Sequence, residues 1–417
     1  MGKLVIQGGN KLNGEVYIHG AKNSVLPILS ATICCAGECV IHNCPKLSDV
    51  DVTIKILEYL GARVKREDDN LTIDTTNVNK YDIPDLLMRE MRSSIVFLSS
   101  IISRFKKAKL SFPGGCELGP RPIDLHLKAL QQMGLVIEEN HGVLDCRVDG
   151  RLRGAHVALS FPSVGATENI MIAASLAEGE TVITNAAREP EICDLADYLI
   201  KSGAKIKGAG EGTVIIEGVK TLNSTEHNVI PDRIAATTFM AAVSSTGGNI
   251  ILNNVIPSHL NSTIPIFKEA GCNLKCFDNK INIISDKKLK PIKIVRTMPY
   301  PGFPTDAQAP IMAMTCLAKG TSVFVENIFE SRYKHVGELL RMGAKIKVDS
   351  RVAVVEGIEM FSGASVKADD LRGGASLIVA GLAAEGFTEI SKVNYIDRGY
   401  ENIETTLNSI GANIKRI

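Results

Sequence analysis

Nearly all-apolar segments of helical length recur six times along the chain. A helix that is apolar on every side is buried inside a protein, because it has no polar face to turn toward water. The pattern therefore predicts six buried helices. The segments lie at residues 23–36, 91–103, 166–177, 233–245, 307–318 and 374–384.

The same pattern follows each apolar segment. A short strand and a loop come first, and then an amphipathic helix that ends at a glycine. Glycine is expected there because it adopts the left-handed conformation beyond a helix without steric cost. A strand, a polar turn and another strand complete the unit. The first strands are predicted at 39–42, 110–112, 181–184, 249–252, 322–325 and 388–391, and the glycines are Gly61, Gly134, Gly203, Gly271, Gly343 and Gly411.

These glycines are 68 to 73 residues apart, so the chain holds six copies of one unit. The sixth copy is cut short at Ile417, and two spare strands, at 3–7 and 15–19, precede the first buried helix. We expect the N-terminus to complete the sixth unit. Residues 1–21 plus 230–417 would then form one discontinuous domain of three units, and residues 22–229 an inserted domain of three. The prediction is an α/β protein with two pseudo-threefold domains, and a solenoid is the alternative.

The composition narrows the class of protein. A formal net charge of +1 over 417 residues does not favour a nucleic-acid-binding protein that relies on overall charge. No apolar stretch is long enough to span a bilayer, and the first residues lack the apolar core of a signal peptide. We therefore expect a cytoplasmic protein that binds neither nucleic acid nor membranes. The ten cysteines should be reduced thiols without zinc-site spacing, and neither a metal nor a cofactor is expected. The oligomeric state stays open.

One stretch rich in glycine and proline, residues 111–122, carries a single thiol, Cys116. Its turn-forming residues predict a loop. Arg121 and Pro122 then open an amphipathic helix, in which proline is well placed in the first turn. A cysteine near an arginine and a helix N-terminus can have a lowered pKa and be reactive. The alternative is an ordinary loop that contains a cysteine.

Cations interrupt the repeat at comparable ends of the units. If the units gather around the N-termini of their helices, these cations and the backbone N–H groups form an anion-binding site. Scattered surface charge is the alternative. The residues are Lys22, Arg92, Arg121, Arg372 and Arg398.

Other polar residues at helix starts have two interpretations. Asp306 is either a general base for a hydroxyl or an acid favoured by the helix dipole. Residues 163–165 either offer N–H groups to a phosphate or a uracil, or cap the helix. Asn23 is a plausible N-cap. His126, on the helix after Arg121, is more typical of a polar surface residue than of a catalyst.

Together these residues resemble the UDP-N-acetylglucosamine 1-carboxyvinyltransferase family, the enolpyruvyl transferases of peptidoglycan synthesis. The resemblance implies the enolpyruvyl transferase fold, an inside-out α/β barrel. In that fold each of two domains has three βαβαββ units, and the active site lies in the cleft between the domains. The motifs that carry the resemblance include Gly20-Ala21-Lys22-Asn23, Phe112-Pro113-Gly114-Gly115-Cys116, Gly119-Pro120-Arg121-Pro122-Ile123, Ser163-Val164-Gly165-Ala166-Thr167, Phe303-Pro304-Thr305-Asp306, Asp370-Leu371-Arg372-Gly373-Gly374 and Asp397-Arg398-Gly399-Tyr400.

The resemblance also implies an activity. Members transfer the enolpyruvyl group of phosphoenolpyruvate to the 3′-hydroxyl of UDP-N-acetylglucosamine by addition and elimination, and they release phosphate. This is the first committed step of peptidoglycan precursor synthesis. The resemblance makes Cys116 the general acid that protonates the enol methylene, forms a covalent phospholactoyl adduct and is alkylated by fosfomycin. It makes Asp306 the base for the sugar hydroxyl.

The remaining roles that the resemblance implies concern binding. Phosphoenolpyruvate would be held by Lys22, Asn23, Arg121 and Arg398, of which Lys22 and Arg398 also count as catalytic. Supporting residues would be Asp370, Arg372 and Arg332. UDP-N-acetylglucosamine would contact Asn23, Arg92, Arg121, Pro122, Ile123, Asp124, Leu125, Ser163, Val164, Gly165, Asp306 and Ile328.

The sequence departs from the family pattern only mildly. Ile123 and Ile328 stand where valine is common, and Phe161-Pro162 precedes Ser163 where some members have a lysine that contacts the nucleotide. One alternative within the fold is 3-phosphoshikimate 1-carboxyvinyltransferase, which lacks the cysteine loop, and another is an RNA 3′-terminal cyclase. A paralogue that binds the UDP-sugar or partners without turnover belongs to a different class. The intact Lys22, Cys116, Asp306 and Arg398 argue against it.

Overall fold

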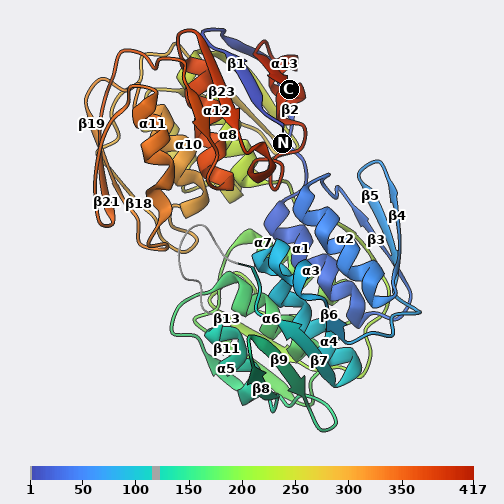
Figure 1. Cartoon of the computed structure of the whole chain (residues 1–417). Helices are drawn as coiled ribbons and strands as arrows, with labels where there is room; N and C mark the ends of the chain where they lie inside the picture. Colours follow the sequence, from blue (N-terminus) through green and yellow to red (C-terminus); the bar gives the residue numbers. More distant parts are fainter. Residues whose placement is uncertain (1, 115–122) are drawn as a thin grey trace. The chain divides into compact units, whose positions relative to one another are not determined.

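The computed structural model describes residues 2–114 and 123–417. The chain divides into two compact units. Residues 20–114 and 123–230 form one unit, and residues 2–19 and 231–417 form the other. Each unit has its own buried apolar core, and the chain passes from one unit to the other after His19 and after Ile230 (Figure 1).

Within the described residues, each unit contains three four-stranded sheets that share one strand order. A short edge strand pairs parallel to the second strand, and the second, third and fourth strands pair antiparallel. In the 20–230 unit the sheets are β14 (Glu226–Asn228), β3 (Glu38–His42), β5 (Asn70–Asp74) and β4 (Arg63–Glu67); β6 (Asp82–Ile83), β7 (Lys107–Ser111), β9 (Val143–Arg147) and β8 (Val136–Asn140); and β10 (His156–Ala158), β11 (Glu180–Thr184), β13 (Thr213–Glu217) and β12 (Lys205–Lys207).

The other unit repeats this order with strands from both ends of the chain. Its sheets are β2 (Leu12–Tyr17), β15 (Gly248–Asn253), β17 (Lys280–Ser285) and β16 (Asn273–Cys276); β18 (Ile294–Arg296), β19 (Thr321–Val325), β21 (Val352–Glu356) and β20 (Lys345–Asp349); and β22 (Ser365–Lys367), β23 (Phe387–Ser391), β1 (Leu4–Gln7) and β24 (Asn413–Arg416).

The strand β1 completes the sixth sheet. It pairs antiparallel with both β23 and β24, so that Ile6 lies opposite Thr388 on one side and Ile414 on the other. In Figure 1 the blue β1 accordingly lies among the red elements of the chain's last part. The second N-terminal strand differs from the prediction. β2 joins the fourth sheet as its parallel edge strand, beside β15.

The buried helices lie behind these sheets. In the unit that contains Pro231–Ile417, α8 (Arg233–Thr246), α10 (Thr305–Thr315) and α12 (Leu371–Ala383) pack against one another pairwise. In the other unit, α4 (Phe97–Phe105) packs between α1 (Lys22–Ala31) and α6 (Val164–Ser175). Short 3₁₀ segments, Thr32–Cys34 and Arg92–Val96, follow α1 and precede α4. The described residues form two separate cores and not the continuous core that a solenoid would have. The predicted α/β class is confirmed.

The outer helices follow the predicted strands. Gly61, which ends α2, has φ +107°, the left-handed conformation expected of a glycine at this position. The helices are α2 (Ser48–Leu60), α5 (Asp124–Gln132), α7 (Pro190–Lys201), α9 (Ile264–Glu269), α11 (Val336–Arg341) and α13 (Ile403–Ser409), with 3₁₀ segments Pro257–Leu260, Arg332–His335 and Val393–Tyr395 before the last three. No helix in the described part of the chain is long and apolar enough to cross a membrane.

The start of the second buried helix was predicted wrongly. In one continuous helix Arg89 and Arg92 would share a face, because they are three residues apart. Met91 between them has an extended backbone (φ −143°, ψ 146°), which ends one helix and begins another. Arg89 therefore lies in α3 (Asp85–Glu90), and Arg92 opens the 3₁₀ segment before α4.

Candidate active site

The candidate residues fall into three groups. Cys116, Arg121 and Pro122 lie outside the described residues. The unit of residues 20–114 and 123–230 carries Lys22, Asn23, Arg92, Ile123, Asp124, Leu125, Ser163, Val164 and Gly165. The unit that contains Pro231–Ile417 carries Asp306, Ile328, Arg332, Asp370, Arg372 and Arg398.

Lys22 is the first residue of α1, where its charge opposes the helix dipole. Its ammonium lies 2.8 Å from a carboxylate oxygen of Asp49, in the first turn of α2. Both residues are buried. In this structure the protein itself therefore supplies the negative charge that offsets the unfavourable position of Lys22 at the helix N-terminus. Nothing in the sequence pattern distinguished Asp49 from an ordinary first-turn acid.

The start of α1 is held by the chain segment that leaves the same unit. The N–H of Ala21 donates to the carbonyl of Ile230 at 2.7 Å. The buried carboxylate of Asp194 in α7 accepts hydrogen bonds from the hydroxyl of Ser24 and, at 3.2 Å, from the N–H of Ile230. Asp194 also lies 2.9 Å from Nε2 of His227. The carboxylate of Asp194 thus connects the first turn of α1 to the segment at Ile230, where the chain leaves this unit.

His126 is buried, so the prediction of a polar surface residue is wrong. Its Nδ1 lies 2.6 Å from the side-chain amide of Asn169 in α6. Burial lowers the pKa of His126 to about 4, and the charge of Arg92 adds to the effect. A Cβ at Gly165 would lie 3.1 Å from the His126 ring, so a glycine at position 165 allows α5 and α6 to approach.

Ser163 caps α6, because its hydroxyl accepts the N–H of Ala166 at 3.4 Å. Asn23 does not cap α1. It is the second residue of that helix and is exposed, and the N-cap is Ala21, whose side chain makes no capping hydrogen bond.

The remaining described candidates of this unit surround the starts of α5 and α6. Ile123 is buried, whereas Leu125, Val164 and Gly165 are half-buried. Asp124 opens α5 and lies 3.2 Å from the ammonium of the exposed Lys128.

Asp306 is bound by two arginines from other elements. Nη2 of Arg332 lies 3.3 Å from Oδ1, while Nη2 and Nε of Arg372 lie 3.1 and 3.3 Å from Oδ2. Both guanidinium groups are buried, yet 27% of the Asp306 side chain remains exposed. The structure therefore brings Asp306, Arg332 and Arg372 together, and it leaves the carboxylate reachable by a ligand.

Arg372 is itself held in place. Its Nη1 donates at 3.2 Å to the hydroxyl of Tyr400, which lies 2.8 Å from the hydroxyl of Thr238. Asp370 caps α12 by accepting the N–H groups of Arg372 and Gly373 at 3.0 Å. The cap is also 3.9 Å from Nη1 of Arg332.

Two predicted residues of this unit lie on loops. Arg398 is half-buried in the turn before α13, and Ile328 is half-buried in the loop after β19.

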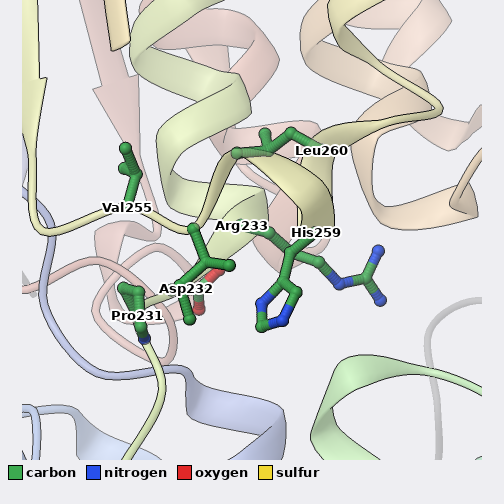
Figure 2. Close-up of a pocket in the computed structure, with 7 residues that line it drawn as sticks. Pro231, Asp232, Arg233, Val255, His259 and Leu260 are labelled. Atoms are coloured by element: carbon green, nitrogen blue, oxygen red, sulfur yellow. The ribbon is translucent and has the colours of Figure 1, made fainter. Parts of the chain in front are cut away.

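A shallow pocket lies at the start of α8 and was not predicted (Figure 2). Asp232 caps α8 by accepting the N–H groups of Ile234 and Ala235 at 2.8 and 2.9 Å. The guanidinium of Arg233 lies over the ring of Tyr300, 5.5 Å from its centroid. The signal was present in the sequence, since Asp232-Arg233 opens α8 much as Asp370-Leu371-Arg372 opens α12. The lining residues are Pro231, Asp232, Arg233, Val255, Ile256, His259 and Leu260.

The sequence matches known proteins along its whole length. A family model described as EPSP synthase (3-phosphoshikimate 1-carboxyvinyltransferase) matches residues 6–407. UDP-N-acetylglucosamine 1-carboxyvinyltransferase 2 of Caldanaerobacter subterraneus subsp. tengcongensis is 52% identical over 417 residues, which cover 100% of both chains. UDP-N-acetylglucosamine 1-carboxyvinyltransferase 1 of Symbiobacterium thermophilum is 48% identical over 100% of this chain and 95% of its own.

Solved structures share the fold at low sequence identity. The enolpyruvyl transferase NikO from Streptomyces tendae superimposes with a TM-score of 0.90 at 23% identity, and it covers 100% of this chain and 98% of its own. EPSP synthase from Acinetobacter baumannii gives a TM-score of 0.78 at 19% identity over 100% of both chains. At these identities the likeness establishes the fold alone.

Proposed function

The chain belongs to the EPSP synthase (3-phosphoshikimate 1-carboxyvinyltransferase) family, and within it we propose that the protein transfers the enolpyruvyl group of phosphoenolpyruvate to the 3′-hydroxyl of UDP-N-acetylglucosamine. The observation that carries this proposal is the full-length identity of 52% and 48% to proteins named UDP-N-acetylglucosamine 1-carboxyvinyltransferase. The protein is thus a transferase of peptidoglycan precursor synthesis.

The proposed reaction is an addition followed by an elimination. In the addition, the sugar oxygen bonds to C2 of phosphoenolpyruvate, the hydroxyl proton passes to Asp306, and Cys116 protonates the methylene carbon. In the elimination, the bond from C2 to the phosphate oxygen breaks, the new methyl group returns a proton to the Cys116 thiolate as the double bond forms again, and Asp306 gives its proton to the departing phosphate. Inorganic phosphate leaves. Positioned acids and bases of this kind contribute about 10²- to 10⁴-fold in rate.

The arrangement around Asp306 supports its role as the base. Arg332 binds Oδ1 and Arg372 binds Oδ2, which fixes the direction of the carboxylate, and part of the side chain stays exposed. A base held in one geometry does not have to be reoriented at the moment of proton transfer, which lowers the barrier.

Charge complementarity supports the assignment of the phosphoenolpyruvate site. The substrate carries a phosphate and a carboxylate, and Lys22, Arg121 and Arg398 are the cations proposed to bind them, with Asn23 beside Lys22. Fixed cations that face charge developing in a transition state are usually a large contribution to catalysis. In this structure Lys22 is paired with Asp49, so binding of the substrate has to compete with that carboxylate for the ammonium.

The proposed UDP-sugar contacts come from both described units: from Asn23, Arg92, Ile123–Leu125 and Ser163–Gly165 in one, and from Asp306 and Ile328 in the other. Arg121 and Pro122 complete this proposal from outside the described residues. Both substrates are metabolites of the cytoplasm, and we therefore propose a cytoplasmic location.

A phosphate-release assay tests the proposed function. The full-length protein is incubated with phosphoenolpyruvate and either UDP-N-acetylglucosamine or shikimate 3-phosphate. We expect release of phosphate only with the UDP-sugar. Release only with shikimate 3-phosphate would assign the protein to the other activity of its family, and release with neither would overturn enolpyruvyl transfer.

A further inference from the structure

Glu326, the residue after β19, has a side chain that connects two segments of the candidate site. Its Oε2 accepts the hydroxyl of Thr305 at 3.0 Å. Its Oε1 accepts the N–H groups of Ile328 and Phe329 at 2.8 and 3.0 Å. Both carboxylate oxygens are therefore used, each toward a different segment of the chain.

The first segment is the start of α10. Thr305 is the first residue of that helix, and Asp306 follows it directly. The carbonyl of Thr305 accepts Nη2 of Arg332 at 3.0 Å, and Arg332 also binds Asp306. Thr305, whose hydroxyl binds Glu326, is thus the residue next to the proposed base Asp306. Its carbonyl also binds Arg332, one of the two arginines that contact Asp306.

The second segment is the loop from Glu326 to Arg332. The two N–H groups bound by Glu326 belong to its turn, and Ile328 is the proposed contact to the UDP-sugar. The same loop is tied to the neighbouring strand end, because the N–H of Asn327 donates to the hydroxyl of Thr297 at 2.8 Å. Arg332 ends the loop and returns to Asp306. Glu326 therefore completes a closed set of hydrogen bonds and ion pairs that includes Asp306 and Ile328, the two residues of this region proposed to contact the substrate.

The burial of Glu326 is costly. The residue is 1% exposed, and the three donors that bind its oxygens are neutral groups, two backbone amides and a hydroxyl. A buried carboxylate is maintained only where several hydrogen bonds offset the loss of water, and such a group fixes the geometry of its partners.

We propose that Glu326 is a positioning residue for Asp306 and Ile328. It sets the start of α10 against the loop, so that the base and the sugar contact keep a fixed separation. This role rests on the proposed function, because it concerns the binding and deprotonation of UDP-N-acetylglucosamine. Glu326 does not touch a substrate and acts through Thr305 and the loop.

The first test compares three variants by steady-state kinetics. Glu326→Ala removes every contact, and kcat/KM for UDP-N-acetylglucosamine should fall about 10- to 100-fold, as a shift of about 1 Å in a catalytic group can cause. The KM for phosphoenolpyruvate should stay at the wild-type value. Glu326→Gln keeps an oxygen for the two N–H groups and an amide for the Thr305 hydroxyl, so it should restore most of the activity. Glu338→Ala is the matched control.

Glu338 is a suitable control because it is also a buried glutamate of the same unit that accepts a backbone N–H, that of Lys367 at 3.2 Å. Its loss should lower the melting temperature and leave both KM values unchanged. If Glu326→Ala behaves in the same way, with only its stability or its active fraction reduced, the positioning role is overturned. It is also overturned if the glutamine variant is as impaired as the alanine variant.

A milder variant keeps the test decisive if Glu326→Ala fails to fold. Thr305→Val removes only the hydroxyl that Glu326 accepts, and it should lower kcat several-fold. Thr246→Val is the control, since its hydroxyl bonds only within α8 and to the adjacent glycine. Wild-type kcat in Thr305→Val would contradict the proposal.

A double-mutant cycle shows whether Glu326 acts through Asp306. In an Asp306→Ala background, Glu326→Ala should cause little further loss of kcat, because the group that it positions is gone. Full additivity of the two losses would overturn the coupling. A wild-type protein that releases no phosphate with either acceptor would refute the proposed function instead, so the two failures are distinguishable.

Discussion

The ammonium of Lys22 lies 2.8 Å from the carboxylate of Asp49, and 11% and 4% of the two side chains are exposed. Removing one partner of such a buried pair leaves the other charge in a low-dielectric environment, whereas removing both is far less costly. The pair therefore links the stability of the 20–230 unit to a residue that we assign to phosphoenolpyruvate.

Replacement of Lys22 should consequently be destabilising as well as inactivating. We expect Lys22→Met to lower the free energy of unfolding by about 3–5 kcal/mol, because Asp49 loses its buried partner. Urea unfolding followed by circular dichroism measures this. The double variant Lys22→Met/Asp49→Leu should regain much of the stability and none of the activity. A single variant as stable as the wild type would show that the pair is not maintained in solution.

Asp306 offers a separate test of the chemistry. Asp306→Ala should reduce phosphate release by about 100-fold or more, since a positioned base contributes about 10²- to 10⁴-fold. Calorimetry should still detect binding of UDP-N-acetylglucosamine, because the other proposed contacts remain. The exposed Asp349 of the same unit supplies the control Asp349→Ala. Normal turnover in Asp306→Ala would remove this carboxylate from the mechanism.

The thiol predicted from the sequence can be tested independently of its position. Cys116→Ser should severely impair turnover and abolish alkylation by fosfomycin, which mass spectrometry of the intact protein detects. A serine hydroxyl is a much weaker acid than a thiol and cannot replace it as proton donor. Cys116→Asp restores an acid, so it should retain turnover while resisting the drug. Fosfomycin labelling that persists in Cys116→Ser would point to another of the cysteines.

The buried His126 predicts a pH dependence of stability. Its pKa of about 4 in the folded protein lies below that of about 6.5 for an imidazole in an unfolded chain. As the pH falls, the unfolded chain binds the proton first, so stability is present above pH 6.5 and is lost toward pH 4. Between pH 7 and pH 5 this loss amounts to about 2 kcal/mol.

The measurement is urea unfolding of the wild type and of His126→Gln at both pH values. The variant lacks the imidazole, so the difference in stability between the two proteins should shrink by this amount as the pH falls. His156→Gln, at an exposed position, is the control. A difference that stays constant from pH 7 to pH 5 would contradict the assignment.

Much of the fold could be predicted because the same boundary signals recur in every copy of the repeat. A glycine after every outer helix and an apolar helix before every first strand fixed the order of elements within a few residues, since both signals are local. The short edge strands were missed. β6 has two residues and β10 three, too few for a period to be visible, and their pairing depends on a neighbour brought close by the fold.

The sequence predicted which residues belong to the candidate site better than it predicted the partners that those residues contact. Charged residues at helix starts singled out Lys22, Asp306 and Arg372, because such positions conflict with an apolar repeat. The partners Asp49 and Glu326 were invisible, since an acid in a first turn or after a strand is unremarkable in sequence. The break at Met91 was also missed, because neither glycine nor proline marks it, and the residues beside it, Glu90 and Arg92, are compatible with a continuous helix.

The sixth sheet has a consequence for synthesis on the ribosome. β1 leaves the ribosome long before both of its neighbours, β23 and β24, which lie about 380 residues or more further along the chain. At roughly 5–20 residues per second, β1 waits on the order of half a minute for its partners. Residues 20–230 contain all the strands of their own three sheets and can fold during that interval. The nascent chain must therefore keep Leu4 and Ile6 from other contacts until β23 and β24 have emerged.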